Sequence, residues 1–337
     1  MLKKAMIMAA GVGSRLEPLS SVVPKPLVPL ANVPTMDILV KHLASFGIKD
    51  IVANTFHKAE AIQEHYKKND FGVDFEFIKE IELSGTAGGV KKCQFFFEEG
   101  QDFIIMSGDG LTDLDIKKAY ESHKKSGSIA TIIIKEIERK ETFKYGIVVP
   151  DEKGYVSSFQ EKPAVEEAKS NLANTGIYIF NYRIFEFIPA NTFYDFAKNV
   201  FPSILESGLK INTFVHKGYW SDIGSLDQYH QSNIDLLNHI INSYKPVVIR
   251  TVNGQYTKGE NVDFAQGVEI KDDCIIGNNC KIGKNTTIKN SIIWDNVEIA
   301  DNLIIENAIL LSNTKIENSI KNQIISEDKL KEHLITV

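Results

Sequence analysis

Isoleucine recurs at every sixth position in the C-terminal quarter of the chain, and this period restricts the possible folds more than any other feature. The series runs through Ile270, Ile276, Ile282 and Ile288. Neither an α-helix nor a simple hairpin has a six-residue repeat, whereas a parallel β-helix does. Trp294 continues the register, which then slips to Ile299 and Ile305. The period therefore predicts a short C-terminal left-handed parallel β-helix, and an irregular antiparallel β tail is the alternative.

The residues between these isoleucines support the repeat and indicate how the tail is covered. Asparagines that suit tight corners stand at Asn278, Asn279 and Asn285. So few coils leave apolar ends, so the tail is expected to pack on the rest of the chain or on a second subunit. Residues 303–305 and 309–311 are more apolar than one inward face requires, which indicates a second buried surface. We therefore expect a homo-oligomer that forms through or with this tail.

The first third of the chain has a different texture, in which short apolar runs alternate with helical patterns. Strands are predicted at 6–9, 51–54, 75–78 and 103–107, and helices at 36–46, 58–66 and 86–97. This alternation predicts a Rossmann-like three-layer α/β domain with a mostly parallel sheet. Glycine-bearing turns at 11–13 and 108–110 follow two of the strands directly. Both turns should lie at the carboxyl edge of the sheet, where such folds bind ligands.

Shorter elements follow residue 127. Strands are predicted at 129–135, 146–149, 155–160 and 176–180, and helices at 193–205 and 226–241. Lys245-Pro246 then interrupts the pattern. The predicted domains are accordingly an α/β domain at 1–242, a linker at 243–257, and the β-helix with its C-terminal extension at 258–337.

Charge and cysteine content exclude several classes of function. A net charge of -6 provides no basic surface for a nucleic-acid backbone. The three cysteines form no CxxC pair and are typical of free thiols in a reducing compartment. No stretch has the roughly 20 apolar residues that a membrane span needs. These features predict a cytoplasmic protein that binds neither membrane nor nucleic acid.

The N-terminal glycine turn carries the first chemical signal. Glycines that directly follow a strand let backbone N–H groups approach phosphate oxygens. The loop is not a Walker A motif, and Leu16 stands where a dinucleotide fingerprint has its third glycine. Arg15 and Lys25, one on the loop and one between two prolines, add two cations. A glycine loop with two cations favours a polyanionic ligand over a plain turn.

Six segments occur in the order seen in one enzyme family. They are residues 11–26 (Gly-x-Gly-Ser-Arg-Leu-x-Pro-Leu-Ser, then Pro-Lys-Pro), 85–88 (Gly-Thr-Ala-Gly), 107–109 (Ser-Gly-Asp), 161–163 (Glu-Lys-Pro), 174–178 (Asn-Thr-Gly-Ile-Tyr) and 219–224 (Tyr-Trp-Ser-Asp-Ile-Gly). Through these segments the chain resembles the nucleotidyltransferase family of sugar-nucleotide pyrophosphorylases, most closely the bacterial mannose-1-phosphate guanylyltransferase-like members. The resemblance covers residues 1–240, and the hexapeptide tail is common among relatives.

The resemblance implies a role for each matched residue. Arg15 and Lys25 would be catalytic, since they match residues that hold the triphosphate and offset leaving-group charge. Asp109 and Asp222 would hold Mg²⁺, a hard cation that one or two carboxylates and substrate phosphates suffice to bind. The implied nucleotide-binding residues are Ala10, Gly11, Gly13, Ser14, Gly85 and Thr86. The implied sugar-phosphate-binding residues are Gly146, Glu161, Lys162 and Asn174, among which Lys162 would bind the phosphate.

Nearby polar residues have simpler interpretations. Asp113 and Asp115 are interpreted as the N-terminus of the next helix. His57, His65 and His216 are interpreted as surface or packing residues, because the histidines show no metal-ligand spacing.

The family resemblance implies transfer of a nucleotidyl group from a nucleoside triphosphate to a sugar 1-phosphate, with release of pyrophosphate. GTP and mannose 1-phosphate, giving GDP-mannose for sugar-nucleotide biosynthesis, are the expected substrates. UDP-, dTDP- or ADP-glucose synthesis is the alternative within the same chemistry. A regulator that binds a nucleotide sugar without turnover is the alternative from another class, and retention of both metal carboxylates argues against it. An acyltransferase tail is disfavoured, because its coils lack a histidine base.

Overall fold

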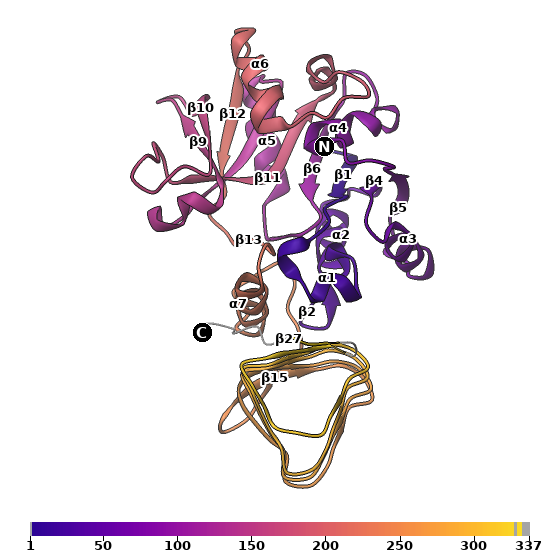
Figure 1. The fold of residues 1–337 in the computed structure, drawn as a ribbon. Coiled ribbons are helices and arrows are strands. Elements are labelled where there is room, and N and C mark those ends of the chain that lie inside the picture. The colour runs from indigo at the N-terminus through magenta and orange to yellow at the C-terminus, as the bar shows by residue number, and fades with distance from the viewer. Residues whose placement is uncertain (1, 327–328, 332–337) are drawn as a thin grey trace. The chain divides into compact units, whose positions relative to one another are not determined.

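The computed structural model describes residues 2–326 and 329–331, and these form two compact units (Figure 1). The first unit combines residues 1–12 with 39–222, and the second combines 13–38 with 223–337. The second unit therefore contains most of the signature loop (residues 11–26, the first segment of the family resemblance), from Gly13 onward, as well as the C-terminal repeat. The predicted boundaries at 242 and 258 stay a prediction.

The first unit is built around one mixed sheet, whose longest path of paired strands runs β10-β9-β11-β6-β1-β4-β5. Its strands are β1 (Lys4–Ala9), β4 (Asp50–Thr55), β5 (Asp74–Lys79), β6 (Asp102–Ser107), β8 (Ala130–Glu136), β9 (Gly146–Pro150), β10 (Val156–Glu161), β11 (Leu172–Asn181) and β12 (Ile211–Val215), and a separate pair joins β7 (Gly110–Thr112) to β13 (Trp220–Asp222). The strands β6, β1, β4 and β5 run parallel, and β11 runs antiparallel to β6 and β8. The predicted α/β class is thus confirmed, and its parallel strands bring their carboxyl ends to one edge.

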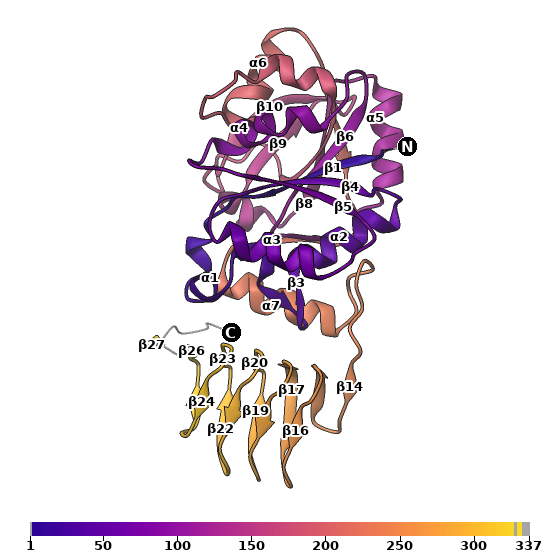
Figure 2. The same ribbon diagram turned by 90° about the vertical axis from the view of Figure 1, so that its right-hand side faces the viewer.

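Helices cover both faces of this sheet. They are α2 (Thr35–Ser45), α3 (Ala59–Lys68), α4 (Gly85–Lys92), α5 (Ile116–Ser126) and α6 (Phe201–Glu206), and a π-helical turn (Phe196–Val200) precedes α6. Figure 2 shows α4 and α6 on one side of the sheet and α2 and α3 on the other. The helix predicted at 86–97 ends earlier, because α4 stops at Lys92 and a 3-10 turn follows (Gln94–Phe96).

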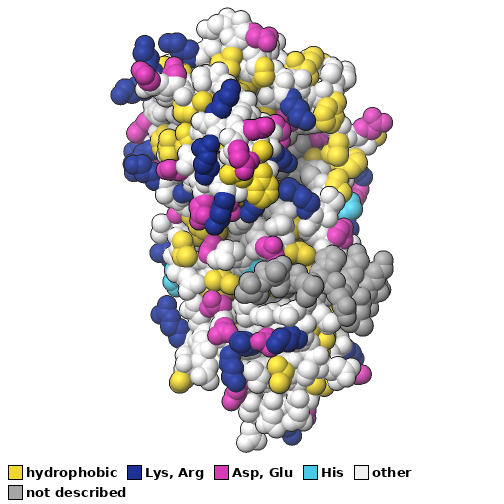
Figure 3. All heavy atoms as spheres, turned by 60° about the vertical axis from the view of Figure 1, so that its left-hand side comes forward, with side chains coloured by type: hydrophobic (Ala, Val, Ile, Leu, Met, Phe, Trp, Pro, Cys, Tyr) yellow, Lys and Arg dark blue, Asp and Glu magenta, His cyan; other side chains and the backbone are white. Residues whose placement is uncertain are grey.

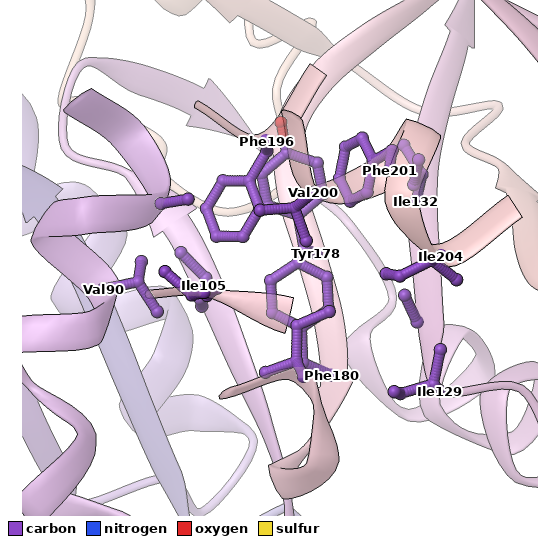
Figure 4. Close-up of a cluster of buried hydrophobic side chains, with 14 of the residues drawn as sticks. Val90, Ile105, Ile129, Ile132, Tyr178, Phe180, Phe196, Val200, Phe201 and Ile204 are labelled. Atoms are coloured by element: carbon purple, nitrogen blue, oxygen red, sulfur yellow. The ribbon is translucent and has the colours of Figure 1, made fainter. Parts of the chain in front are cut away.

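An aromatic cluster fills the interior on the α4 and α6 side. Tyr178 and Phe180 of β11 stack with ring centroids 5.3 Å apart, and Phe196 lies 5.3 Å from Tyr178 (Figure 4). Val90 of α4 and Ile105 of β6 belong to the same buried cluster. Large rings bury much apolar surface and dominate core stability. This packing holds the strands whose ends carry the predicted site residues.

The second unit contains the predicted β-helix, whose coils trace a triangle (Figure 1). Its elements are α1 (Leu19–Val22), β2 (Pro29–Leu30), β3 (Val33–Pro34), α7 (Leu226–Leu237), β14 (Ile249–Arg250), β15 (Gly254–Lys258), β16 (Asp263–Phe264), β17 (Glu269–Ile276), β18 (Lys281–Ile282), β19 (Thr287–Lys289), β20 (Ile292–Ile293), β21 (Glu298–Ile299), β22 (Ile304–Glu306), β23 (Ile309–Leu310), β24 (Lys315–Ile316), β25 (Ile320–Lys321), β26 (Ile324–Ser326) and β27 (Lys329–Lys331). Parallel pairing places Ile288 between Ile270 and Ile305 on successive coils. The six-residue isoleucine series therefore forms the interior of the coils.

One predicted register position is wrong. Ile276 pairs with Ile293, seventeen residues later, and Ile293 belongs to the buried interior cluster. The coil is one residue shorter than three hexapeptides, so the inward position falls on Ile293 instead of Trp294. The Trp294 Nε1–H instead donates to the Tyr229 hydroxyl of α7 at 3.0 Å.

Asparagines occupy the coil corners, as predicted. Asn279 and Asn285 have φ values of 56° and 54°, a backbone region in which asparagine is favoured. Their side chains form ladders, since the Asn279 amide donates to Asn296 at 3.1 Å. Charged ladders add to them, because Lys281 lies 2.9 Å from Glu298. Figure 3 shows basic and acidic side chains interspersed over the face in view.

The second apolar surface predicted for the tail is buried only in part, since Ile309, Leu310 and Leu311 are buried but Ile304 is 55% exposed. Ile275, Ile292 and Ile309 alternate with interior residues, yet each is buried. The helix α7 packs on β15 and β17, and buries Tyr229 and Leu236. The helix α7 therefore covers part of the apolar surface that β15 and β17 form.

Two further observations concern the predicted class of protein. Cys93, Cys274 and Cys280 are all free and buried. Within residues 2–326 and 329–331, no helix is both long and apolar enough to cross a bilayer.

Candidate active site

A short antiparallel ladder brings the two predicted metal ligands together. Asp109 follows the end of β6, and its carboxylate accepts a hydrogen bond from the Ser107 hydroxyl. In the β7–β13 pair, Asp222 lies directly opposite Gly110, the residue after Asp109. Residues opposite each other in such a ladder have Cα atoms about 4.5–5.5 Å apart. The backbones of Asp109 and Asp222 therefore lie close together at one corner, at the carboxyl end of β6.

These oxygen donors fit a small hard cation. In the described part of the chain, no group of three or more His, Cys, Asp or Glu side chains is arranged to hold a metal. Zinc and other strongly bound metals usually take three or four protein ligands. Mg²⁺ is instead bound through one or two carboxylates plus substrate phosphates, which suits a corner with two aspartates.

The four predicted sugar-phosphate residues also lie close together. Glu161 pairs directly with Gly146 across the β9–β10 ladder. A methyl group added at position 146 would lie 3.2 Å from Glu161 Oε2 and 3.9 Å from Asn174 Cβ. Lys162 follows Glu161, and its backbone N–H donates to the Tyr145 carbonyl at 3.2 Å. The two motifs that contain Glu161 and Asn174 thus meet around one turn.

Trp220 joins this turn to the metal corner. It lies in β13, two residues before Asp222, and its indole Nε1–H donates to the Thr175 carbonyl at 3.2 Å. Its ring centroid is 5.3 Å from that of Tyr145, in an edge-to-face arrangement. The tryptophan therefore connects β13 to Thr175 of β11, next to Asn174, and to Tyr145, whose carbonyl accepts the Lys162 N–H.

The matched segment 85–88, which contains the predicted nucleotide-binding residues Gly85 and Thr86 and is called the base loop below, begins helix α4. Gly85 has φ of +77°, and a Cβ there would overlap the Tyr194 carbonyl oxygen. That carbonyl accepts the Ala87 and Gly88 N–H groups at 3.0 and 3.1 Å, so the chain itself caps the helix. The Thr86 hydroxyl donates to Asp195 Oδ2 at 2.8 Å. Tyr194 and Asp195 therefore shape the loop, and nucleotide contacts of Gly85 and Thr86 stay a prediction.

Sequence reasoning missed a buried carboxylate behind this loop. Glu80 is 3% exposed, and accepts hydrogen bonds from the Asn54 amide at 2.6 Å and the Lys92 ammonium at 2.8 Å. It also accepts from both the hydroxyl and the backbone N–H of Ser84. The Asn54 oxygen in turn accepts the Ala9 N–H at 3.2 Å. This network connects the end of β1, before Ala10 and Gly11, to the start of the base loop.

The rest of the signature loop lies in the second unit. Gly13 has φ of +74° and begins a 3-10 turn (Ser14–Leu16) that contains the exposed Arg15. The Ser20 hydroxyl donates to the Gly13 carbonyl at 2.9 Å. Lys25 begins a second 3-10 turn (Lys25–Leu27), and its Cβ would lie 3.1 Å from a Cβ added at Gly13. Gly13 and Lys25 are thus neighbours, as a glycine loop that presents cations requires.

Two interpretations of neighbouring residues are now resolved. Asp115 caps α5, since its carboxylate accepts the Lys118 N–H at 3.0 Å. Asp113 does not cap the helix, because its Oδ1 accepts the Tyr219 N–H at 2.7 Å. His216 is buried, and its Nε2 lies 2.9 Å from the Tyr219 carbonyl. Asp113 and His216 therefore contact the segment that leads into Asp222, which no local pattern indicated.

Comparison with known proteins assigns the family. The sequence profile described as nucleotidyl transferase matches residues 4–239. The chain belongs to the nucleotidyl transferase family. A second profile, described as the GMPPB C-terminal domain, matches residues 252–330. The two matched segments agree with the resemblance to sugar nucleotidyltransferases that the sequence motifs indicated.

Several members of the nucleotidyl transferase family are similar over most of the chain. A UTP--glucose-1-phosphate uridylyltransferase of Synechocystis is 34% identical over 318 residues, which cover 86% of this chain and 82% of that protein. A mannose-1-phosphate guanylyltransferase catalytic subunit beta of Drosophila pseudoobscura pseudoobscura is 33% identical, over 66% of this chain and 59% of its own length. The crystal structure of HddC from Yersinia pseudotuberculosis complexed with GMP-PN is similar with a TM-score of 0.60 and 28% identity, covering 69% of this chain and 99% of HddC.

Proposed function

We propose that the protein transfers a guanylyl group from GTP to mannose 1-phosphate, forming GDP-mannose and pyrophosphate. The match of residues 252–330 to the profile described as the GMPPB C-terminal domain carries this choice. The similarity to mannose-1-phosphate guanylyltransferases and to a structure complexed with GMP-PN supports it.

In the proposed reaction an oxygen of the sugar phosphate attacks the α-phosphorus of the triphosphate. A new P–O bond forms there as the bond to the bridging oxygen breaks, and pyrophosphate leaves with the electron pair. The second pKa of a phosphate monoester is about 6, so the nucleophile is largely dianionic at neutral pH and needs no general base. Catalysis then consists of positioning two polyanions and stabilising charge on the leaving group.

The chain's own residues would divide these tasks. Lys162, on the turn beside Glu161, would bind the sugar phosphate through a charge-assisted hydrogen bond. Arg15 and Lys25 would bind the triphosphate and offset the charge that grows on pyrophosphate. Asp109 and Asp222 would hold Mg²⁺, which would neutralise phosphate charge when bound.

UTP and glucose 1-phosphate are the second candidate pair. One specific observation favours them: the uridylyltransferase of Synechocystis is 34% identical to this chain and covers 86% of it. The reaction and the roles of the residues would be the same, and only the base and sugar contacts would differ.

A pyrophosphate-release screen tests the proposal. Purified protein with Mg²⁺ is assayed with GTP, UTP, dTTP and ATP, each against mannose, glucose and N-acetylglucosamine 1-phosphates. The highest kcat/KM is expected for GTP with mannose 1-phosphate. A preference for UTP with glucose 1-phosphate would replace it with the second candidate. A folded protein that turns over no pair would favour a nucleotide-sugar-binding regulator.

Variants of the metal corner test the mechanism. Asp109→Asn and Asp222→Asn should each lose most turnover, since each removes a charged oxygen ligand from a site with few of them. Circular dichroism should show an unchanged fold. A near wild-type kcat at saturating Mg²⁺ would exclude that aspartate as a metal ligand.

A further inference from the structure

A buried carboxylate extends the β7–β13 ladder by one residue pair. The ladder ends where Trp220 pairs with Thr112. Beyond it, the Asp113 N–H donates to the Tyr219 carbonyl at 3.2 Å, and Asp113 Oδ1 accepts the Tyr219 N–H at 2.7 Å. A backbone ladder would use a carbonyl where Asp113 uses its side chain. The side chain of Asp113 thus fixes the residue three positions before Asp222.

Further contacts surround the backbone of Tyr219. The Thr112 hydroxyl donates to the Tyr219 carbonyl at 3.1 Å. His216 Nε2 lies 2.9 Å from that carbonyl and 3.3 Å from Asp113 Oδ1. Since both neighbours accept hydrogen bonds, Nε2 must carry the hydrogen. Burial lowers the pKa of His216, which favours the neutral ring in that tautomer. Asp113, Thr112 and His216 together hold both the backbone N–H and the carbonyl of Tyr219.

Gly218 leaves no space for a side chain between the backbone at residue 218 and Asp113 or His216. Gly218 precedes Tyr219, and a Cβ at position 218 would overlap Asp113 Oδ1 and lie 2.7 Å from His216 Cε1. Backbone and carboxylate can approach so closely only because residue 218 has no side chain. The position of the 216–219 segment relative to Asp113 is therefore defined closely.

Helix formation does not explain this buried carboxylate. The side chain of Asp113 is 6% exposed, and burying a charge is costly unless its partners repay the cost. The helix that follows already has its N-cap in Asp115. What Asp113 joins are two segments that each carry a metal-ligand candidate, Asp109 on one and Asp222 on the other.

We propose that Asp113 is a positioning residue for the metal site: by fixing Tyr219, it sets the placement of Asp222 relative to Asp109. The inference rests on the proposed function, which assigns Asp109 and Asp222 to Mg²⁺. Asp113 itself is no ligand in this assignment. Residues that orient metal ligands typically change metal affinity by about 10–100-fold when they are removed.

Direct metal binding to the full-length chain tests this proposal. Free Mn²⁺ is measured by electron paramagnetic resonance as protein is added, and Mg²⁺ then displaces it. Asp113→Ala removes the acceptor for Tyr219, and Gly218→Ala displaces the segment while it leaves the carboxylate in place. Both should weaken Mn²⁺ binding about tenfold or more. Asp113→Asn keeps an oxygen acceptor, and should restore affinity to within about threefold of wild type.

Asp115→Asn is the matched control, since it changes a carboxylate two residues away that only caps α5. It should leave Mn²⁺ affinity unchanged, whatever it does to the melting temperature. In turnover assays, Asp113→Ala and Gly218→Ala should require about tenfold more Mg²⁺ for half-maximal rate. If Asp113→Ala fails to fold, Gly218→Ala and Asp113→Asn still decide the question.

The outcomes separate this inference from the proposed function. Affinity for Mn²⁺ within twofold of wild type in Asp113→Ala and Gly218→Ala would overturn the positioning role and leave the proposed reaction intact. An equal loss in Asp115→Asn would also overturn it, because the effect would then be general. A wild-type chain that binds no Mn²⁺ and turns over without Mg²⁺ would overturn the metal assignment and the inference together.

Discussion

Replacing Glu80 with alanine should destabilise the first unit and loosen the base loop. The Glu80 carboxylate is the shared acceptor for Asn54, Ser84 and Lys92, and Lys92 also donates to the Glu82 carbonyl at 3.3 Å. Asn54 and Ser84 are buried, so water cannot replace the lost partner readily. The substitution therefore leaves donors unsatisfied where β1 and α4 meet.

The size of the effect follows from these donors. A buried donor left without an acceptor costs about 1–3 kcal/mol. The Asn54 amide and the Ser84 N–H are two such donors, whereas the Lys92 ammonium is 33% exposed and can be hydrated. The free energy of unfolding should fall by about 2–5 kcal/mol. Urea unfolding of purified protein measures it, and hydrogen exchange of α4 should show faster opening than in the wild type.

The pH dependence of this difference has a definite sign. Burial by itself would raise the pKa of Glu80, but hydrogen bonds from Lys92, Ser84 and Asn54 outweigh it and lower the pKa from 4.5. A carboxylate whose pKa is lowered by folding stabilises the native state above its unfolded pKa. The difference between wild type and variant should therefore be full at pH 7. It should shrink as the pH falls below about 4.5 and through the folded pKa.

Glu82→Ala provides the control, because Glu82 is an exposed acid on the same loop. It should change the free energy of unfolding by less than about 0.5 kcal/mol. Equal stability of Glu80→Ala and Glu82→Ala would refute the reasoning. A gap between Glu80→Ala and wild type that grows below pH 4.5 would refute it as well.

Four further outcomes are expected. Lys162→Ala should raise the KM for the sugar phosphate more than that for the triphosphate, because a lost charge-assisted contact is worth about 1.5–3 kcal/mol; a larger rise for the triphosphate would contradict the role. Arg15→Ala should lower kcat, since leaving-group charge develops in the transition state; steady-state kinetics showing a change in KM alone would exclude this. Ile293→Ala should lower the free energy of unfolding by about 2–5 kcal/mol, because it opens a cavity in the coils. Ile304→Ala, at a residue that is 55% exposed, should lower it by less than about 0.5 kcal/mol, and thermal unfolding of both variants tests the difference. Light scattering should show at least a dimer for the full chain, and lost solubility for a chain ending at Ser243, which uncovers the buried face of α7; two well-behaved monomers would disprove both.

Much of the fold could be predicted because its signals are local. The parallel strands β1 and β6 are largely apolar runs, and the glycine turns at 11–13 and 108–110 mark where they end. The β-helix repeats one short unit, so its period is legible in a single sequence. The inward residue was misplaced only where a seventeen-residue coil moved the position from Trp294 to Ile293. The shortened coil cannot be recognised from the local sequence, because Trp294, beside the inward-facing Ile293, is also apolar.

Among the candidate site residues, sequence determined the types and the order. Asp109 and Asp222 stand in motifs whose flanking residues identify them. Their proximity, however, depends on the pairing of β7 with β13, strands more than a hundred residues apart. Sequence alone could propose both aspartates as metal ligands, but it could not show that the strands beside them pair.

Only the tertiary structure decided which other polar residues serve that corner. Asp113 and Asp115 look alike in sequence, both acidic and both ahead of a helix, and local rules interpreted them alike. In the folded chain Asp115 caps the helix, whereas Asp113 accepts a hydrogen bond from Tyr219, which is 106 residues away. Glu80 likewise acquires its role from Asn54 on a neighbouring strand. Periodicity and caps reflect interactions within a few residues along the chain, whereas a buried polar group is defined by partners that only folding brings within hydrogen-bond distance.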